Sequence, residues 1–180
     1  MTAKRIEAVL RPASVAVVGA SDTPGSIGEV LCRNLREGGF RGPVFYVNPL
    51  HATIGDELSY PDVRSLPQTV DVAIVATPPP TLPTVLEHCG ERGVRGAIIV
   101  SAGFREGGEA GAAWERSMLQ VARRYGLRLL GPNSFGVIRT DNGFNASCGA
   151  ALPKPGRLAL VSQSSALCAA TLDWARSRHV

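Results

Sequence analysis

Short, nearly continuous apolar runs alternate along this chain with longer stretches of mixed apolar and polar positions. Apolar runs bounded by glycine, proline or other small residues are typical of strands buried on both faces of a parallel sheet. The pattern predicts five such strands, at 14–20, 43–49, 71–78, 96–103 and 127–133. Helices are predicted between them at about 27–38, 81–92 and 109–125, with Thr81 as the N-cap of the second.

This alternation predicts an α/β fold, a Rossmann-like doubly wound parallel sheet. The segment between the second and third strands, "GDELSYPDVRSLPQTV" at 55–70, is expected to form a turn and a short helix. Ligands of doubly wound sheets bind beyond the carboxyl ends of the strands, where the strand order reverses. The segments that follow the strands are therefore the candidate site: "GAS", "NPLH", "ATPPP", "SAGF" and "GPNSFG".

The character of the chain changes after residue 133. Glycine, asparagine and proline dominate residues 134–155, which we interpret as a hairpin or linker. From residue 156, "GRLALVSQSSALCAATLDWARSR" predicts another strand, a polar turn and a helix. A single β-α unit cannot cover its own apolar faces. The sequence therefore predicts a Rossmann-like domain at 1–133, a hairpin or linker at 134–155 and, at 156–180, the start of a second, truncated α/β domain.

Composition narrows the class of protein. The chain has 180 residues, of which 44% are apolar and 19% charged, as in an ordinary globular domain. No apolar run has the length of a membrane span, and the N-terminal residues do not form a secretory signal, so a cytoplasmic location is expected. The net charge of +4 with scattered arginines and 6% aromatic residues predicts neither a nucleic-acid nor a membrane partner. The four cysteines are widely spaced, so no metal site is expected.

Residues 19–28, "GASDTPGSIG", form what we call the glycine turn, between the first predicted strand and the first predicted helix. A strand–turn–helix junction binds phosphate because backbone N–H groups point outward at the helix start. Dinucleotide binding requires G-x-G-x-x-G and an acid about 20 residues further on. Here Gly19 and Gly25 are separated by five residues, and the second strand ends in Val47-Asn48-Pro49. A phosphate-rich ligand other than NAD is favoured, and an NAD(P)-binding redox module is the weaker alternative.

Seven motifs occur in an order that resembles one known family: "LRPASVAVVGAS", "VFYVNP", "VDVAIVATPP", "IIVSAGF", "LRLLGPNSFGV", "FNAS" and "GRLALVSQSSAL…LDWA". They resemble the N-terminal CoA-binding domain of NDP-forming (ADP-forming) acyl-CoA synthetases, related to the alpha subunit of succinyl-CoA synthetase. The resemblance covers essentially all of residues 6–178 and implies that the second domain is flavodoxin-like. "SQSSAL" and "LDWA" also look like the synthetase-like region of bacterial protein lysine acetyltransferases.

The resemblance implies that CoA or acyl-CoA, with acetyl-CoA as the first expectation, binds along the strand ends. Within the glycine turn, the residues implied to hold the phosphates are Gly19, Ala20, Ser21, Gly25, Ser26, Ile27 and Gly28. The implied remainder of the ligand path is Asn48, Pro49, Thr77, Pro78, Pro79, Ser101, Ala102, Gly103 and Asn133. Family members often carry a basic residue after the "NP" of the second strand, where this chain has Leu50 and His51.

A second set of residues resembles the family turn that helps to hold a phosphorylated histidine. These phosphate-turn candidates are Ser162, Gln163, Ser164 and Ser165, the last replacing the usual glycine. The phosphorylated histidine itself lies further downstream in the family, and His51, His88 and His179 are not in its context. No catalytic residue is assigned, and the chain alone is not expected to be catalytically competent.

Taken together, the resemblance implies a CoA-binding module of an acetate–CoA ligase or of a synthetase-like protein acetyltransferase. Its partners would be the remaining synthetase domains or an ATP-grasp subunit, or an acetyltransferase domain, and a homo-oligomer is possible. A stand-alone CoA-binding protein without catalysis is the alternative.

Overall fold

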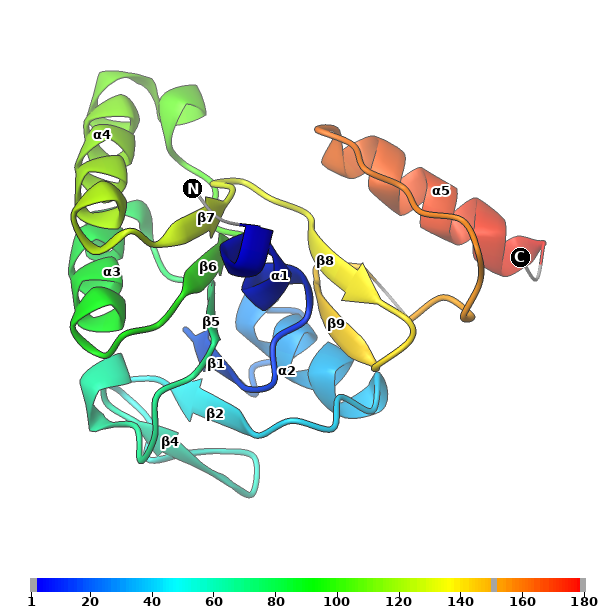
Figure 1. Cartoon of the computed structure of the whole chain (residues 1–180), viewed down its shortest axis with the longest axis horizontal. Coiled ribbons are helices and arrows are strands. Elements are labelled where there is room, and N and C mark those ends of the chain that lie inside the picture. Colours follow the sequence, from blue (N-terminus) through cyan, green and yellow to red (C-terminus); the bar gives the residue numbers. More distant parts are fainter. Residues whose placement is uncertain (1–2, 150–151, 179–180) are drawn as a thin grey trace.

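The computed structural model describes residues 3–149 and 152–178, and a mostly parallel sheet forms its centre (Figure 1). Seven strands lie in the order β3-β4-β2-β1-β5-β6-β7. The five predicted strands are confirmed: β1 (Val15–Val18), β2 (Val44–Val47), β5 (Val72–Val75), β6 (Gly96–Ile99) and β7 (Arg128–Leu130). All five run parallel, which confirms the Rossmann-like α/β fold.

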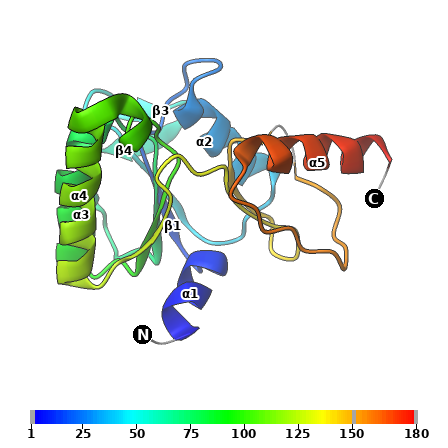
Figure 2. The ribbon, with the colours of Figure 1, turned by 90° about the horizontal axis from the view of Figure 1, so that it is seen from above.

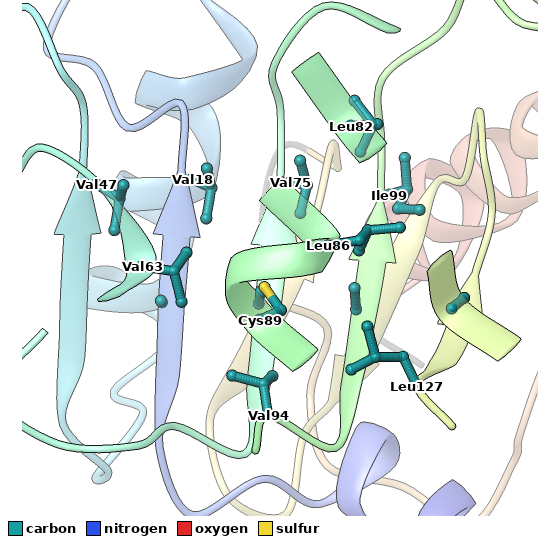
Figure 3. Close-up of a cluster of buried hydrophobic side chains, with 14 of the residues drawn as sticks. Val18, Val47, Val63, Val75, Leu82, Leu86, Cys89, Val94, Ile99 and Leu127 are labelled. Atoms are coloured by element: carbon teal, nitrogen blue, oxygen red, sulfur yellow. The ribbon is translucent and has the colours of Figure 1, made fainter. Parts of the chain in front are cut away.

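The strand register places the carboxyl ends of neighbouring strands level with one another. Val18, the last residue of β1, pairs with Val47 on one side and with Val75 on the other. Figure 3 shows Val47, Val18, Val75 and Ile99 in a row across four adjacent strands. The strand order reverses between β1 and β5, since the chain first builds outward through β2 and then crosses back to β5. A ligand crevice is therefore expected beyond Val18 and Val75.

Helices cover both faces of the sheet (Figures 1 and 2). α3 (Leu82–Glu91) and α4 (Gly108–Tyr125) lie on one face. The other face is covered by α1 (Ala3–Leu10), α2 (Ile27–Glu37) and an antiparallel hairpin of β8 (Gly136–Arg139) and β9 (Phe144–Ser147). The three predicted helices are thus α2, α3 and α4, whereas α1 was not predicted.

Two apolar clusters, one on each face, explain why the strands are apolar throughout. Ala16 and Val18 pack into the cluster beneath α3 and α4, part of which is drawn in Figure 3. Val15 and Val17, which alternate with them, pack against Leu31 of α2 and the hairpin. Successive side chains of a strand point to opposite faces. Because both faces are buried, every position of β1 is apolar.

The segment 55–70 differs from its expected structure. It contributes β4 (Glu57–Tyr60), which pairs in parallel with β2, and a short 3₁₀ turn, η1 (Val63–Ser65); the preceding β3 (Thr53–Ile54) pairs antiparallel with β4 at the sheet edge. The predicted turn and short helix were therefore wrong in part. The backbone of β4 pairs with the otherwise open edge of β2, a non-local interaction that apolar spacing alone does not signal.

The strand predicted after residue 156 is absent from residues 152–164, whereas the helix that follows it is α5 (Ser165–Ser177). Leu158 and Val161 are 89% and 97% exposed, respectively. A strand forms only when its backbone groups pair with a neighbour, and the residues described here offer this segment no neighbouring strand. The hairpin of β8 and β9 lies within the predicted hairpin or linker, and the division of the chain at residues 133/134 and 155/156 stays a prediction. None of the helices described here could span a membrane.

Candidate functional site

The glycine turn is fixed to the end of β2 by backbone and side-chain hydrogen bonds. Gly19 N donates to Val47 O at 2.9 Å, directly after the last residue of β1. The Asn48 side-chain amide donates to Ala20 O at 2.8 Å and accepts from Leu50 N at 2.9 Å. Asn48 therefore connects two strand ends, and both ends of its amide are used within the protein. Pro49, which follows it, is exposed.

Two glycines let the turn fold back on the start of α2. Gly19 has a φ of +86°, and a Cβ built on it would lie 3.0 Å from both Ala76 O and Thr77 Cγ2. A Cβ on Gly28 would lie only 2.1 Å from Gly19 O. Because this oxygen belongs to the backbone, a change of side-chain rotamer cannot relieve the clash. Gly25 has a φ of +78° but open space around it, so its conformation is what favours glycine there.

Two backbone donors at the start of α2 are not used within the fold. Ser26 is the N-cap, and its hydroxyl accepts from Glu29 N at 3.1 Å. Within the described part of the chain, the N–H groups of Ile27 and Gly28 have no acceptor. Unpaired N–H groups at a helix N-terminus, together with the helix dipole, favour an anion. The Ser21 hydroxyl is already used in shaping the turn, because it accepts from Thr23 N at 3.0 Å.

The thiol of Cys32 lies beneath the turn and is not a reactive group. Burial raises the pKa of Cys32 to about 11, although the backbone N–H of Ser21 donates to its sulfur and lowers it. The protonated thiol is a weak nucleophile. Cys32 therefore supports the turn by packing rather than by chemistry.

The end of β5 connects the glycine turn to the end of β6. The Thr77 methyl group faces Gly19, while its hydroxyl lies 2.8 Å from the hydroxyl of Thr81. Thr81 is the N-cap residue of α3, as predicted, but its hydroxyl does not bond to the helix backbone, because it bonds instead to Thr77 and to Pro78 O. Pro79 begins a 3₁₀ turn, η2 (Pro79–Thr81), and its ring lies 3.2 Å from a Cβ built on Gly103.

The segments after β6 and β7 are joined by one carboxylate. Gly103 N donates to Glu106 Oε1 at 2.8 Å, and Asn133 Nδ2 donates to the same oxygen at 3.3 Å. Asn133 N also donates to Ser101 O at 2.9 Å. Ser101 is buried, whereas Ala102, Gly103 and Asn133 are exposed at this edge.

The structure thus brings the predicted residues of the first domain to one edge of the sheet, in a continuous line from Asn48 through the glycine turn, Thr77 and Gly103 to Asn133. The phosphate-turn candidates are not part of this line. Ser164 is the N-cap of α5, its hydroxyl accepting from Leu167 N at 3.2 Å, and Ser162 Oγ accepts from Ser164 N at 3.0 Å. Gln163 and Ser165 are exposed. A phosphate-binding role for these four residues stays a prediction.

Two contributors to the site were missed from the sequence. Glu106 belongs to a short 3₁₀ turn, η3 (Arg105–Gly107), and hydrogen bonds from backbone N–H groups, chiefly that of Gly103, lower its pKa. Asp22 of the glycine turn accepts from Gly55 N at 3.4 Å, which brings the turn of the β3–β4 hairpin to the rim of the site. Glu106 follows Gly103 by three residues, the spacing at which an acid accepts from a backbone N–H in a local capping interaction. This spacing is the signal in the sequence that could have identified Glu106.

Fold and site together define a class of protein. Its doubly wound sheet carries the glycine turn at the point where the strand order reverses. The dinucleotide fingerprint and the acid at the end of β2 are both missing from the sequence. These features indicate a domain that binds a phosphorylated ligand other than NAD.

Comparison with known proteins identifies the family. Residues 13–140 match the CoA binding domain. The chain belongs to this family. It is 41% identical over 175 residues to the ADP-forming acetate–CoA ligase I of Archaeoglobus fulgidus, covering 97% of this chain and 25% of that protein. It is 43% identical over 173 residues to the alpha subunit of the ADP-forming acetate–CoA ligase I of Pyrococcus furiosus, covering 94% of this chain and 37% of that subunit.

A solved structure agrees with the sequence matches. The acetyl-coenzyme A synthetase 1 of Ca. Korarchaeum cryptofilum, in complex with phosphate and ADP, has a TM-score of 0.88 and 36% sequence identity to this chain. The match covers 94% of this chain and 36% of that one. The chain therefore corresponds to the N-terminal part of ADP-forming acetyl-CoA synthetases and spans less than half the length of these three relatives.

Proposed function

We propose that this chain binds CoA or acyl-CoA along the carboxyl edge of its sheet, with the CoA phosphates at the glycine turn. The observation that carries the proposal is the turn itself. Gly28 packs closely against Gly19, and the N–H groups of Ile27 and Gly28 at the start of α2 have no acceptor among the described residues. The strand-end residues from Thr77 to Asn133 would then follow the pantetheine arm.

The end of β2 argues against the NAD(P) alternative. A dinucleotide-binding domain presents an acid there to the ribose hydroxyls. Here Asn48 stands at that point, and its amide is already bonded to Ala20 O and Leu50 N. Without a carboxylate at this position, the adenosine ribose of NAD would lose its usual partner.

We further propose that the domain works as one part of an ADP-forming acyl-CoA synthetase, together with further synthetase domains or an ATP-grasp subunit. The support is the share of each relative that the chain covers, 25% of the Archaeoglobus fulgidus ligase and 37% of the Pyrococcus furiosus alpha subunit. Acetyl-CoA is the acyl-CoA proposed first, because both of these relatives are acetate–CoA ligases. A cytoplasmic location belongs to the same proposal.

Thermal unfolding with and without ligand tests the binding proposal. A ligand that binds only the folded state stabilises it by about 2.7 kcal/mol at a hundredfold excess over its dissociation constant. For a domain of this size that corresponds to an increase of roughly 5–10 °C in melting temperature. We expect such a shift with CoA and acetyl-CoA and none with NAD.

Two further measurements, at raised ionic strength and with dephospho-CoA, test whether the phosphates anchor the ligand. Because charged phosphates would anchor the ligand, rising ionic strength should weaken CoA binding, and dephospho-CoA should bind less tightly than CoA. A shift with NAD and none with CoA would contradict the proposal.

A further inference from the structure

Glu106 is a carboxylate at the edge of a site proposed to bind a polyanion. Like charges repel, so this position is unexpected unless Glu106 has a structural role. The side chain is exposed, yet it is held in place, because Oε1 accepts from both Gly103 N and Asn133 Nδ2. Gly103 follows β6 and Asn133 follows β7, so one side chain connects two strand ends.

The bond to Glu106 determines which way the Asn133 amide faces. An ionised carboxylate accepts hydrogen bonds and donates none, so only the NH₂ group of Asn133 can face it. The Asn133 backbone is fixed as well, with a φ of +51° and a hydrogen bond from its N–H to Ser101 O. Within the described residues, Asn133 Oδ1 has no donor. The amide therefore presents a free acceptor with a defined orientation.

The charge of Glu106 indicates which part of CoA lies beside it. The phosphates carry the negative charge of CoA and would be repelled by a carboxylate. The pantetheine arm is uncharged and contains two secondary amides, each with one N–H donor. An acceptor such as Asn133 Oδ1 fits such a donor, and a neighbouring carboxylate does not oppose an uncharged group.

We propose that Glu106 is a positioning residue that orients the Asn133 amide, so that Asn133 Oδ1 accepts a hydrogen bond from an amide N–H of the pantetheine arm. This inference rests on the proposed function and names the two residues that would recognise the arm rather than the phosphates. Glu106 acts through Asn133 and through the Gly103 N–H. Asn133 is the residue that touches the ligand.

Calorimetric titration with two ligands separates the arm from the phosphates. CoA carries both, whereas adenosine 3′,5′-bisphosphate keeps phosphate groups and lacks the pantetheine arm. We expect Glu106→Ala and Asn133→Ala each to weaken CoA binding about fivefold, the effect of losing one typical hydrogen bond. Binding of the bisphosphate should not weaken in either variant.

Three further variants distinguish positioning from a general effect on charge or folding. The double variant Glu106→Ala/Asn133→Ala should bind CoA no more weakly than either single variant, because both changes remove the same contact. Glu106→Gln keeps an acceptor and should bind CoA within about twofold of the unmodified chain. Glu109→Ala, a matched loss of charge three residues away in the first turn of α4, should leave CoA binding unchanged.

Two results would overturn the inference while leaving the proposed function intact. One is an equal loss of CoA and bisphosphate binding in Glu106→Ala, and the other is additive losses in the double variant. If the unmodified chain binds neither ligand, the proposed function itself fails and this inference fails with it.

Discussion

At the scale of single residues, Gly28 is the position in the glycine turn with the least room for a side chain. Its role is not conformational freedom, since it lies within α2 and has an ordinary helical backbone. The requirement is space, because a Cβ would lie 2.1 Å from the carbonyl oxygen of Gly19. Any side chain there must push the turn away from the helix start.

We expect Gly28→Ala to abolish the increase in melting temperature with CoA and to lower the melting temperature of the free chain. Alanine favours the helix over glycine by about 1 kcal/mol, whereas overpacking costs about 1–3 kcal/mol. Because the clash is with a backbone oxygen, we expect a net destabilisation of about 2 kcal/mol. The displaced turn also no longer aligns its N–H groups with phosphate. Thermal unfolding with and without CoA measures both effects.

Gly107→Ala is the matched control, because a Cβ at Gly107 meets nothing within 4 Å. This variant should retain the CoA shift. An undiminished shift in Gly28→Ala would show that the phosphates bind elsewhere.

At the scale of elements, α2 connects the glycine turn to the hairpin of β8 and β9. Its N-terminus carries the turn, and two turns further along Asn34 is 2% exposed. The Asn34 amide donates to Ser147 O and to Gly149 O, both at 2.8 Å. The backbones also meet, since a Cβ on Gly143 would lie 2.3 Å from Gly38 O. The hairpin is thereby held on α2, and it covers a sheet face that would otherwise be open.

Asn34→Leu should destabilise the fold by about 1–3 kcal/mol, because buried carbonyl groups lose their donor. Equilibrium unfolding in urea measures the change. CoA binding should persist in the folded variant, since the bonds at the start of α2 do not involve Asn34.

Gln120→Leu makes the same kind of change at an exposed position of α4 and should alter stability by no more than about 0.5 kcal/mol. If Asn34→Leu proved as stable as Gln120→Leu, the two hydrogen bonds of Asn34 would contribute nothing to holding the hairpin.

At the scale of the whole molecule, residues 152–178 differ from the rest of the chain. All residues from 154 to 161 are exposed, and α5 has no buried residue among those described. Trp174 and Leu167 are 57% and 53% exposed. Figure 2 shows α5 extending away from the sheet and its covering helices. This arrangement fits the proposal that further parts of a synthetase cover this region.

Limited trypsin digestion of the 180-residue chain should cut first after Arg157, in the exposed segment before α5. The fragment of residues 1–157 should keep the melting temperature of the whole chain, because neither apolar cluster includes a residue beyond 146 among those that the structure describes. Mass spectrometry identifies the cut, and a scan of the purified fragment gives its stability. Protection of Arg157, or a fragment that unfolds earlier, would mean that α5 contributes to the core.

The sequence by itself determined the five central strands, the helices between them and the edge that carries the site. It could do so because strands buried on both faces are apolar at every position, and because parallel strands direct their carboxyl ends to one edge. The glycine turn was recognisable for a local reason as well. Its residues are contiguous, so the spacing that excludes a dinucleotide fingerprint can be counted along the chain.

Only the tertiary structure decided the features that depend on distant residues. β4 exists because its backbone pairs with the edge of β2, and residues 156–164 form no strand because they pair with no neighbouring strand among the described residues. Asn48 stays a predicted ligand contact, and the structure adds that its amide also holds Ala20, 28 residues earlier in the chain. Glu106 and Asn133 lie 27 residues apart and meet only once β6 and β7 are paired. Pairings of this kind follow from packing across the sheet, which no local pattern of residues encodes.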